Sequence, residues 1–281
     1  MELSDLAVFR AVVAAGGVTK AAGRLNRVQS NVTVRIKKLE EDLGAELFSR
    51  QGRGLKLAPA GTVLLSYAER MLELADEARE AVGRGTFTGT LRLGAMESTA
   101  AVRLPAPLAE YHRRHPGITL ELKTGASLPL VGQVLQGGLD AALVAEPVED
   151  ARLETLAVYT EDLVVVLPPG TSAPDGTRLT LLAFQQGCAY RKTLEEWVAG
   201  RGLVPDRIVE MPSYHGMLGC VAAGMGIALA PTSLLDSYSG RSSLSLLPLG
   251  PAGRFRTLLV WRRTAPRARI DALADILAKT G

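Results

Sequence analysis

The side chains near the N-terminus that are best suited to chemistry are short, polar and closely spaced. Gln29 and Asn31 each carry an amide, which places a donor beside an acceptor, and Arg35 carries a guanidinium. In the major groove of DNA, such amides pair with adenine and a guanidinium pairs with guanine. The hydroxyls of Ser30 and Thr33 bond readily to a phosphate or a base. These residues therefore point to recognition of nucleic acid rather than to catalysis.

The charge distribution favours a polyanionic partner for this part of the chain alone. Residues 1–58 hold ten lysines and arginines against six acids, a net charge of +4, which leaves −1 for the rest of a chain whose total is +3. Cations that neutralise phosphates supply most of the affinity for DNA. A solvated charged surface is the alternative, because charge alone does not separate the two. The expected phosphate contacts are the hydroxyl of Thr19 and the cations Arg24, Lys37, Lys38, Arg50 and Arg53.

Apolar residues at helical spacing predict the elements that carry these side chains. Residues 3–14 form one expected helix, and two glycines separate it from "KAAGRL", for which Thr19 is the expected cap. A third helix has an apolar stripe that leaves the polar side chains of "QSNVTVRIKK" on its outer face, and this stripe is Val32, Ile36, Leu39 and Leu43. The order of these helices predicts a helix-turn-helix.

A basic β-hairpin and a long helix are predicted next. Strands at 46–50 and 55–57 flank a tip rich in glycine and arginine, so residues 1–58 are expected to form a winged helix-turn-helix. The helix begins at Pro59 and belongs to a linker of residues 59–89. Its apolar residues recur in steps of three and four, and they are Leu64, Tyr67, Met71, Leu74, Ala78 and Ala81. This repeat predicts a homodimer through the helix. Packing within its own chain is the alternative.

Beyond a Gly- and Thr-rich hinge at residues 83–89, the pattern changes to strands that alternate with helices. Examples are "ITLELKT" followed by "LPLVGQVLQGG", and "LTLLAF" followed by "YRKTLEEWVAGRG". Such alternation is typical of parallel α/β sheets. Residues 90–281 are therefore expected to form an α/β body.

Composition and missing motifs limit the functions that remain. Hydrophobic residues make up 47% of the 281, which suits globular domains, and no apolar run approaches the length of a membrane span. The N-terminus begins with acids, so we expect a cytoplasmic protein that is nucleoid-associated when bound to DNA. The sequence contains no nucleophile elbow, phosphate loop or dinucleotide fingerprint. We therefore expect no enzyme, no cofactor and no metal.

Taken together, the head, linker and body resemble the LysR-type transcriptional regulators of bacteria. The resemblance rests on "TKAA", "LEEDLGAELF" and "PAG" in the head, and on "HPGITLEL", "GGLDAALV" and "CVAAGMGIALAP" in the body. It implies two Rossmann-like subdomains, similar to periplasmic binding proteins, with a small metabolite bound between them. The first subdomain would comprise residues 90–161 and 265–281, and the second 162–264.

The resemblance also implies partners for the chain. These are double-stranded DNA with dyad half-sites and further copies of the chain, usually as a homotetramer. RNA polymerase is a further candidate. No membrane is expected to take part.

Ligands of open α/β sheets bind at the carboxyl ends of strands, which locates candidate effector contacts. The resemblance favours Ser98 and Thr99, and at the next strand end it places Ala126 where relatives often have serine or threonine. Serines and threonines at helix starts are often only caps. The other candidates are Ser127, Cys188, Tyr190, Arg191, Ser213, Tyr214 and His215.

Two of these residues suggest particular chemistry. Arg191 adds positive charge near a helix start, which is locally unfavourable, so we expect it to hold an anionic metabolite, above all a carboxylate. Cys188 near Arg191 suggests, as an alternative, a redox-sensing regulator, although its potential partner Cys220 lies in an apolar helix. A constitutive DNA-binding protein without an effector is a further alternative.

Overall fold

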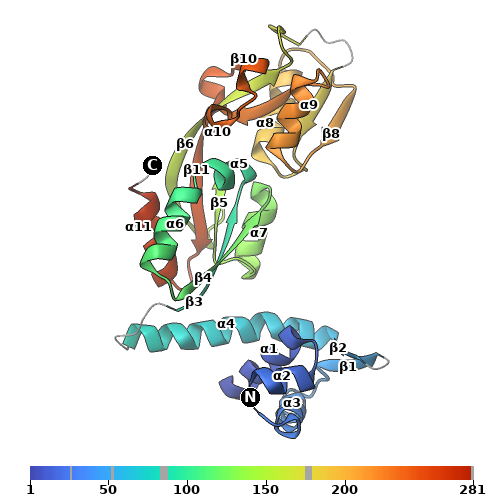
Figure 1. Cartoon of the computed structure of the whole chain (residues 1–281), viewed down its shortest axis with the longest axis vertical. Coiled ribbons are helices and arrows are strands. Elements are labelled where there is room, and N and C mark those ends of the chain that lie inside the picture. The colour runs from blue at the N-terminus through green and yellow to red at the C-terminus, as the bar shows by residue number, and fades with distance from the viewer. Residues whose placement is uncertain (26, 52–53, 83–87, 175–178, 280–281) are drawn as a thin grey trace. The chain divides into compact units, whose positions relative to one another are not determined.

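Three helices, a β-hairpin and a long helix form the first of two units into which the chain divides, Met1–Gly89 and Thr90–Gly281 (Figure 1). The computed structural model describes all residues except 26, 52–53, 83–87, 175–178 and 280–281. Most of the hinge expected at 83–89 thus lies outside the described residues. Among the described helices, none alone is long and apolar enough to cross a bilayer. Helices α1 (Leu3–Ala15) and α2 (Val18–Arg24) pass that test only together, across a bend of 114°.

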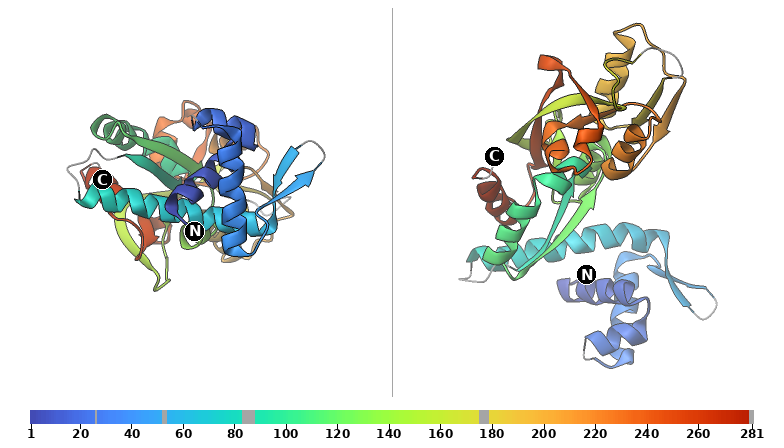
Figure 2. Two further views of the ribbon diagram at one scale, coloured as in Figure 1. Left: turned by 90° about the horizontal axis from the view of Figure 1, so that it is seen from below. Right: turned by 45° about the horizontal axis from the view of Figure 1, so that its top comes forward.

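The head is a winged helix-turn-helix, as predicted (Figure 2). Phe9, Val32 and Leu39 are fully buried in its core, so the stripe expected on the third helix does face inward, although Leu43 at its end is exposed. Thr19 is the second residue of its helix rather than the expected cap, because the helix begins at Val18, two residues earlier than expected. The elements are α1 (Leu3–Ala15), α2 (Val18–Arg24), α3 (Gln29–Leu43), β1 (Phe48–Gln51) and β2 (Gly54–Leu57).

One carboxylate and one glycine fix the wing against the helices. Oε1 of Glu40 on α3 accepts hydrogen bonds from the backbone N–H groups of Leu47, at 2.8 Å, and Phe48, at 3.3 Å. Gly61, in the first turn of the long helix α4 (Pro59–Val82), lies so close to this segment that a Cβ atom would be 2.2 Å from the carbonyl oxygen of Leu47. The "LEEDLGAELF" and "PAG" motifs therefore join α3, the hairpin and α4 in a fixed geometry.

The long helix α4 (Pro59–Val82) has two apolar faces. One face packs on α1 through the buried Ala68 and Leu72, so the helix does have a partner within its own chain, which its sequence did not reveal. The predicted seam forms another face: Leu64 and Met71 are half-buried, but Tyr67 and Leu74 are 54% and 59% exposed. The side chain of Ala81 lies outside the described residues. Packing within the chain is therefore observed for one face of the helix, and the homodimer through the exposed positions stays a prediction.

In the second unit, helices lie on both faces of a mixed sheet. Figure 1 shows α6 (Pro105–Arg114) and α11 (Ala268–Leu277) on one face and α7 (Ser127–Gln136) on the other. The order of the sheet is β10-β6-β11-β5-β3-β4, with β9 also paired to β6. Its strands are β3 (Gly89–Ala95), β4 (Ile118–Thr124), β5 (Ala141–Ala145), β6 (Leu153–Leu167), β9 (Ala228–Pro231), β10 (Ser245–Pro248) and β11 (Arg254–Arg262).

A second, two-stranded sheet lies beside β9. Strands β7 (Thr180–Ala183) and β8 (Arg207–Glu210) are parallel to each other, and an isolated bridge links Leu181 to Ile227. The remaining helical elements among the described residues are four α-helices and two 3₁₀ helices. They are α5 (Glu97–Val102), α8 (Ala189–Ala199), α9 (Tyr214–Ala222), α10 (Thr232–Ser237), η1 (Arg241–Ser243) and η2 (Gly250–Gly253).

The sheet departs from the expected parallel pattern because β6 and β11 cross between the two subdomains. β3 and β5 are parallel, but β11 runs antiparallel to both β5 and β6. Residues 254–262, which we expected in the second subdomain from their place in the chain, thus pair in the sheet of the first. Residues 153–162 of β6 pair with β11, and residues 163–167 pair with β9 and β10.

Arg35 on α3 is bound to α1. Its Nη1 donates to Oδ1 of Asp5 at 2.7 Å and to Oγ of Ser4 at 2.9 Å. Asp5 is only 3% exposed, and its other carboxylate oxygen has no hydrogen-bond partner among the described residues. A buried carboxylate needs such a partner because its desolvation is costly. The contact ties the recognition helix to the first helix.

We therefore expect Arg35→Ala to destabilise the head by about 1.5–3 kcal/mol, since it leaves the Asp5 carboxylate unpaired. Amide hydrogen exchange of α1 and α3 in the full chain should become roughly ten- to a hundred-fold faster. Lys37→Ala, at an exposed position of the same helix, is the matched control and should change exchange little. Equal exchange in the two variants would show that the pair contributes nothing to the fold.

Candidate functional site

The outer face of α3 carries most of the side chains predicted to contact DNA. Gln29, Ser30 and Asn31, in its first turn, are exposed, as are Lys37 and Lys38 further along. Exposed amides at the start of a recognition helix have the access that base edges require. The first turn of α3 is therefore free to enter a groove.

The other DNA candidates are placed differently. Thr19 is exposed on α2, whereas Thr33 is half-buried and its hydroxyl donates to the carbonyl of Gln29 at 3.0 Å. The pairing of Arg35 with Asp5 argues against its predicted role at a base edge, because the guanidinium is held against α1. Arg53 and the side chain of Arg50 lie outside the described residues.

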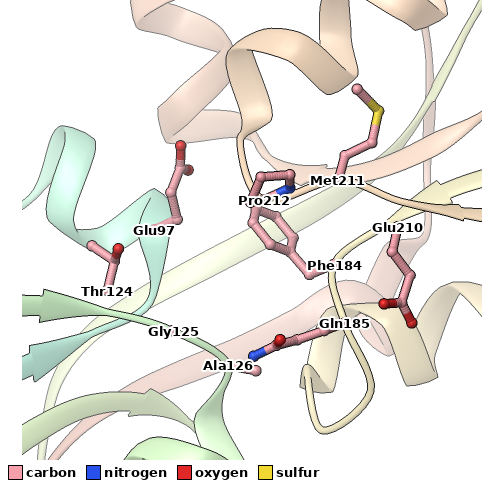
Figure 3. A pocket seen from close by; sticks show the side chains of 9 residues that line it. All are labelled: Glu97, Thr124, Gly125, Ala126, Phe184, Gln185, Glu210, Met211 and Pro212. Atoms are coloured by element: carbon pink, nitrogen blue, oxygen red, sulfur yellow. The ribbon is translucent and has the colours of Figure 1, made fainter.

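The second unit contains a cavity of about 360 Å³ where strand ends of both subdomains meet (Figure 3). This volume is within the usual range for small-molecule sites. Figure 3 shows Glu97 and Thr124 on one side and Glu210 on the other, with the ring of Phe184 between them. The lining residues are Glu97, Thr124, Gly125, Ala126, Phe184, Gln185, Glu210, Met211 and Pro212.

The residues that line the cavity are held in place by the ends of strands from both subdomains. In the first subdomain, β3 leads directly into α5, and Gly125, which follows β4, donates its N–H to the carbonyl of Ala95 at 3.1 Å. In the second, the parallel strands β7 and β8 end side by side and deliver Phe184 and Met211. Parallel strands that end at one edge leave their loops around a crevice. The cavity thus lies where strand order predicted a ligand.

Glu97 connects the two subdomains at this cavity. Its Oε1 accepts a hydrogen bond from the backbone N–H of Tyr214 at 3.3 Å, while its buried Oε2 has no partner among the described residues. Burial raises the pKa of the Glu97 carboxyl above its ordinary value, and the N–H of Tyr214 opposes the shift only in part. The carboxylate is therefore held at the cavity at a cost in desolvation.

Arg191 is bound within the protein rather than presented to the cavity, contrary to our prediction for an anionic ligand. Its Nε donates to Glu195 at 2.8 Å, and its Nη1 donates to Glu210 at 2.5 Å and to the carbonyl of Phe184 at 3.1 Å. The side chain is 10% exposed. Two carboxylates thus satisfy the positive charge that local reasoning had treated as unpaired.

A smaller space of about 20 Å³ adjoins the cavity and shares Glu97, Gly125, Ala126 and Phe184 with it. Several predicted residues line it, namely Ser98, Ala126, Cys188, Tyr190 and Tyr214. The hydroxyls of Tyr190 and Tyr214 are buried and have no partner among the described residues, and burial raises the pKa of both. Their rings pack edge-on against Phe255 and Phe184 respectively.

The remaining effector candidates do not line either space. Oγ of Ser127 accepts from the N–H of Ala145 at 3.2 Å, which is a structural contact, and Thr99 is buried in α5. Ser213 precedes α9 without a side-chain cap bond, and His215 is exposed beside the ring of Tyr238. Sequence reasoning missed Thr124, Phe184, Gln185, Glu210, Met211 and Pro212, although each ends or directly follows a strand.

Removing the Glu97 charge should stabilise the protein. Because the folded-state pKa is raised above the ordinary 4.5, ionisation disfavours folding, and stability is lost as pH rises through the folded pKa. Glu97→Gln should therefore have a higher Tm than the wild type at pH 7.5, and the difference should vanish near pH 4, where the wild type is protonated. Thermal unfolding at both pH values measures this. A lower Tm at pH 7.5 would show that the carboxylate is stabilising.

Comparisons with known proteins agree with both units. Residues 3–62 match the family model described as "Bacterial regulatory helix-turn-helix protein, lysR family", and residues 84–281 match "LysR substrate binding domain". In Bacillus subtilis (strain 168), the uncharacterized HTH-type transcriptional regulator YusT is 39% identical over 256 residues, covering 90% of this chain and 86% of that protein. The HTH-type transcriptional regulator GltR of the same strain is 39% identical over 243 residues, covering 85% and 82%.

Solved structures share the fold over the whole chain. A full-length OxyR variant from Pseudomonas aeruginosa has a TM-score of 0.72 at 25% identity, covering 99% of this chain and 94% of that one. Full-length CbnR in complex with its target DNA has a TM-score of 0.68 at 22% identity and complete coverage of both chains. The relatives are transcriptional regulators rather than enzymes. With both of its units matched, this chain belongs to the LysR family of DNA-binding transcriptional regulators.

Proposed function

We propose that the head of this chain reads operator half-sites and that a small molecule in the cavity beside Glu97 controls the activity of the protein. The exposed first turn of α3 carries the DNA-reading part of the proposal: Gln29 and Asn31 contact base edges, and Lys37 and Lys38 contact phosphates. Arg35 supports the head from within through Asp5.

Two heads are proposed to act together. Tyr67 and Leu74 leave an apolar face of α4 uncovered within the chain, and Met1, Leu43 and Val63 add to it from the head and the helix start. A second copy packed on this face buries it and sets two recognition helices about one turn of DNA, or a multiple, apart. The proposed operator therefore has dyad half-sites. Further association to a homotetramer, and contact with RNA polymerase, extend the same proposal.

Base contacts and phosphate contacts predict different losses. Gln29→Ala or Asn31→Ala should weaken binding to an operator, selected in vitro from random DNA, by about 1–3 kcal/mol more than binding to random duplex. The double variant Lys37→Ala, Lys38→Ala should weaken binding to the operator and to random duplex equally. It should also reduce the slope of log K against log salt concentration by about 2. Fluorescence anisotropy measures both effects, with the exposed Glu41→Gln on the same helix as control. Equal losses on both DNAs for the amide variants would make them phosphate contacts.

The redox alternative finds little support in the site. Cys188 precedes α8, where backbone N–H groups favour a thiolate, but burial outweighs them and raises the pKa of the thiol. Both Cys188 and Cys220 are free thiols. Oxidation proceeds through the thiolate, which a raised pKa suppresses.

In the Cys220→Ala variant, where Cys188 is the remaining cysteine, alkylation by iodoacetamide at pH 7.5 should be at least about tenfold slower than that of free glutathione. Mass spectrometry follows the adduct with time. Guanidinium-unfolded protein provides the control, because unfolding exposes the same thiol and should restore its reactivity. Alkylation of the folded variant as fast as glutathione would revive the redox hypothesis.

A further inference from the structure

Carboxylates dominate the charge at the cavity. Among its described lining residues, Glu97 and Glu210 are acids and none is a lysine, arginine or histidine. The nearby cation, Arg191, is paired with Glu210 and with Glu195, so these four groups together carry a net negative charge. An anionic ligand here faces uncompensated repulsion, whereas a cationic one is attracted.

The two acids are not equivalent. Glu210 already receives the Arg191 guanidinium at 2.5 Å. Glu97 receives only the N–H of Tyr214, on Oε1, and its Oε2 is shielded from solvent without a partner among the described residues. A buried carboxylate oxygen in this state is unfavourable unless a donor reaches it. Glu97 is therefore the acid at the cavity with capacity for a new donor.

Two further polar groups at the same place need partners. Tyr190 and Tyr214, each 3% exposed, line the smaller space together with Glu97, and both hydroxyls lack partners among the described residues. Buried polar atoms are normally hydrogen-bonded, so three such atoms around one space are exceptional. The ring of Phe184 borders both spaces and offers a face on which a cation can rest.

We propose that the effector is a small organic cation, whose ammonium, amidinium or guanidinium group donates to Oε2 of Glu97 and whose apolar part packs on Phe184. The inference rests on the proposed function, since it names the ligand class of the regulatory cavity. Met211 and Pro212 supply further apolar lining. The hydroxyls of Tyr190 and Tyr214 are the additional partners for polar atoms of the ligand.

A ligand bound at Glu97 is placed to affect the contact between the two subdomains. Oε1 of Glu97, at the start of α5, holds the N–H of Tyr214, at the start of α9 in the second subdomain. Leu128, on α7, likewise donates its N–H to the carbonyl of Gly187 at 3.2 Å. A cation on Oε2 therefore acts on a carboxylate that already links the two subdomains.

Three probes of similar shape and different charge test the proposal on the full chain: benzamidine, benzamide and benzoate. A fragment of this size is expected to bind with a Kd of about 1 mM, so each is used at about 10 mM. Benzamidine should raise the Tm of the wild type, and agmatine should do the same as an aliphatic cation. Benzamide should have a smaller effect and benzoate none.

Variants of Glu97 test whether the cation binds to this residue. By calorimetry, Glu97→Gln should weaken benzamidine binding about 10- to 100-fold while keeping the shape of the side chain. Glu97→Asp keeps the charge and should retain part of the affinity. Glu196→Gln, at an exposed position of α8, is the matched control and should bind as the wild type does.

Several results would overturn the inference: stabilisation by benzoate, no stabilisation by either cation, or equal benzamidine affinity in Glu97→Gln and the wild type. The same samples are tested for binding to random duplex by anisotropy. If the DNA binds and the cations do not, the ligand class is wrong and the DNA-reading function stands. If the DNA does not bind, the proposed function itself fails.

Discussion

The hydrogen bonding of one strand, β6, determines how the rest of the second unit is arranged. Its first ten residues pair with β11 in the sheet of the first subdomain, and its last five pair with β9 and β10 in the second. At the crossover, Glu161 accepts from Nε of Arg103, the residue directly after α5, at 2.7 Å and from Oγ of Ser233 on α10 at 2.6 Å. The strand and this buried carboxylate hold together the two sets of loops that line the cavity.

The parts of the fold set by local periodicity could be predicted, and the parts set by distant contacts could not. The apolar stripe of α3 follows directly from helical spacing, so its buried and exposed faces were foreseen. The partner of Arg35 lies 30 residues away on another helix, and one partner of Arg191, Glu210, lies 19 residues away at the end of β8. Nothing in the spacing reveals Asp5 or Glu210, although Glu195, four residues after Arg191 on the same helix, is at the spacing of a helical ion pair.

The candidate cavity shows the same limit. The cavity lies at the strand ends from which a site was predicted, but the choice of residues favoured hydroxyls, whereas Phe184, Met211 and Glu210 form part of the lining. Ser98 and Ala126 do lie at its inner end, while Ser127 is used to bind the backbone of β5. Which residue of a turn faces a cavity depends on the orientation of each turn, and this is set by packing between subdomains rather than by local sequence.

The close approach of Gly61 to the carbonyl of Leu47 bears on how a signal is transmitted through the protein. Because there is no space for a side chain between α4 and the segment that begins the wing, the two have no room to slide past each other. The linker helix and the wing therefore form a stiff lever. In a pair of chains joined along α4, any change in the angle at which the helices cross becomes a change in the distance and tilt between the two wings. For the proposed dimer, such a change would alter the spacing of half-sites that the two heads fit.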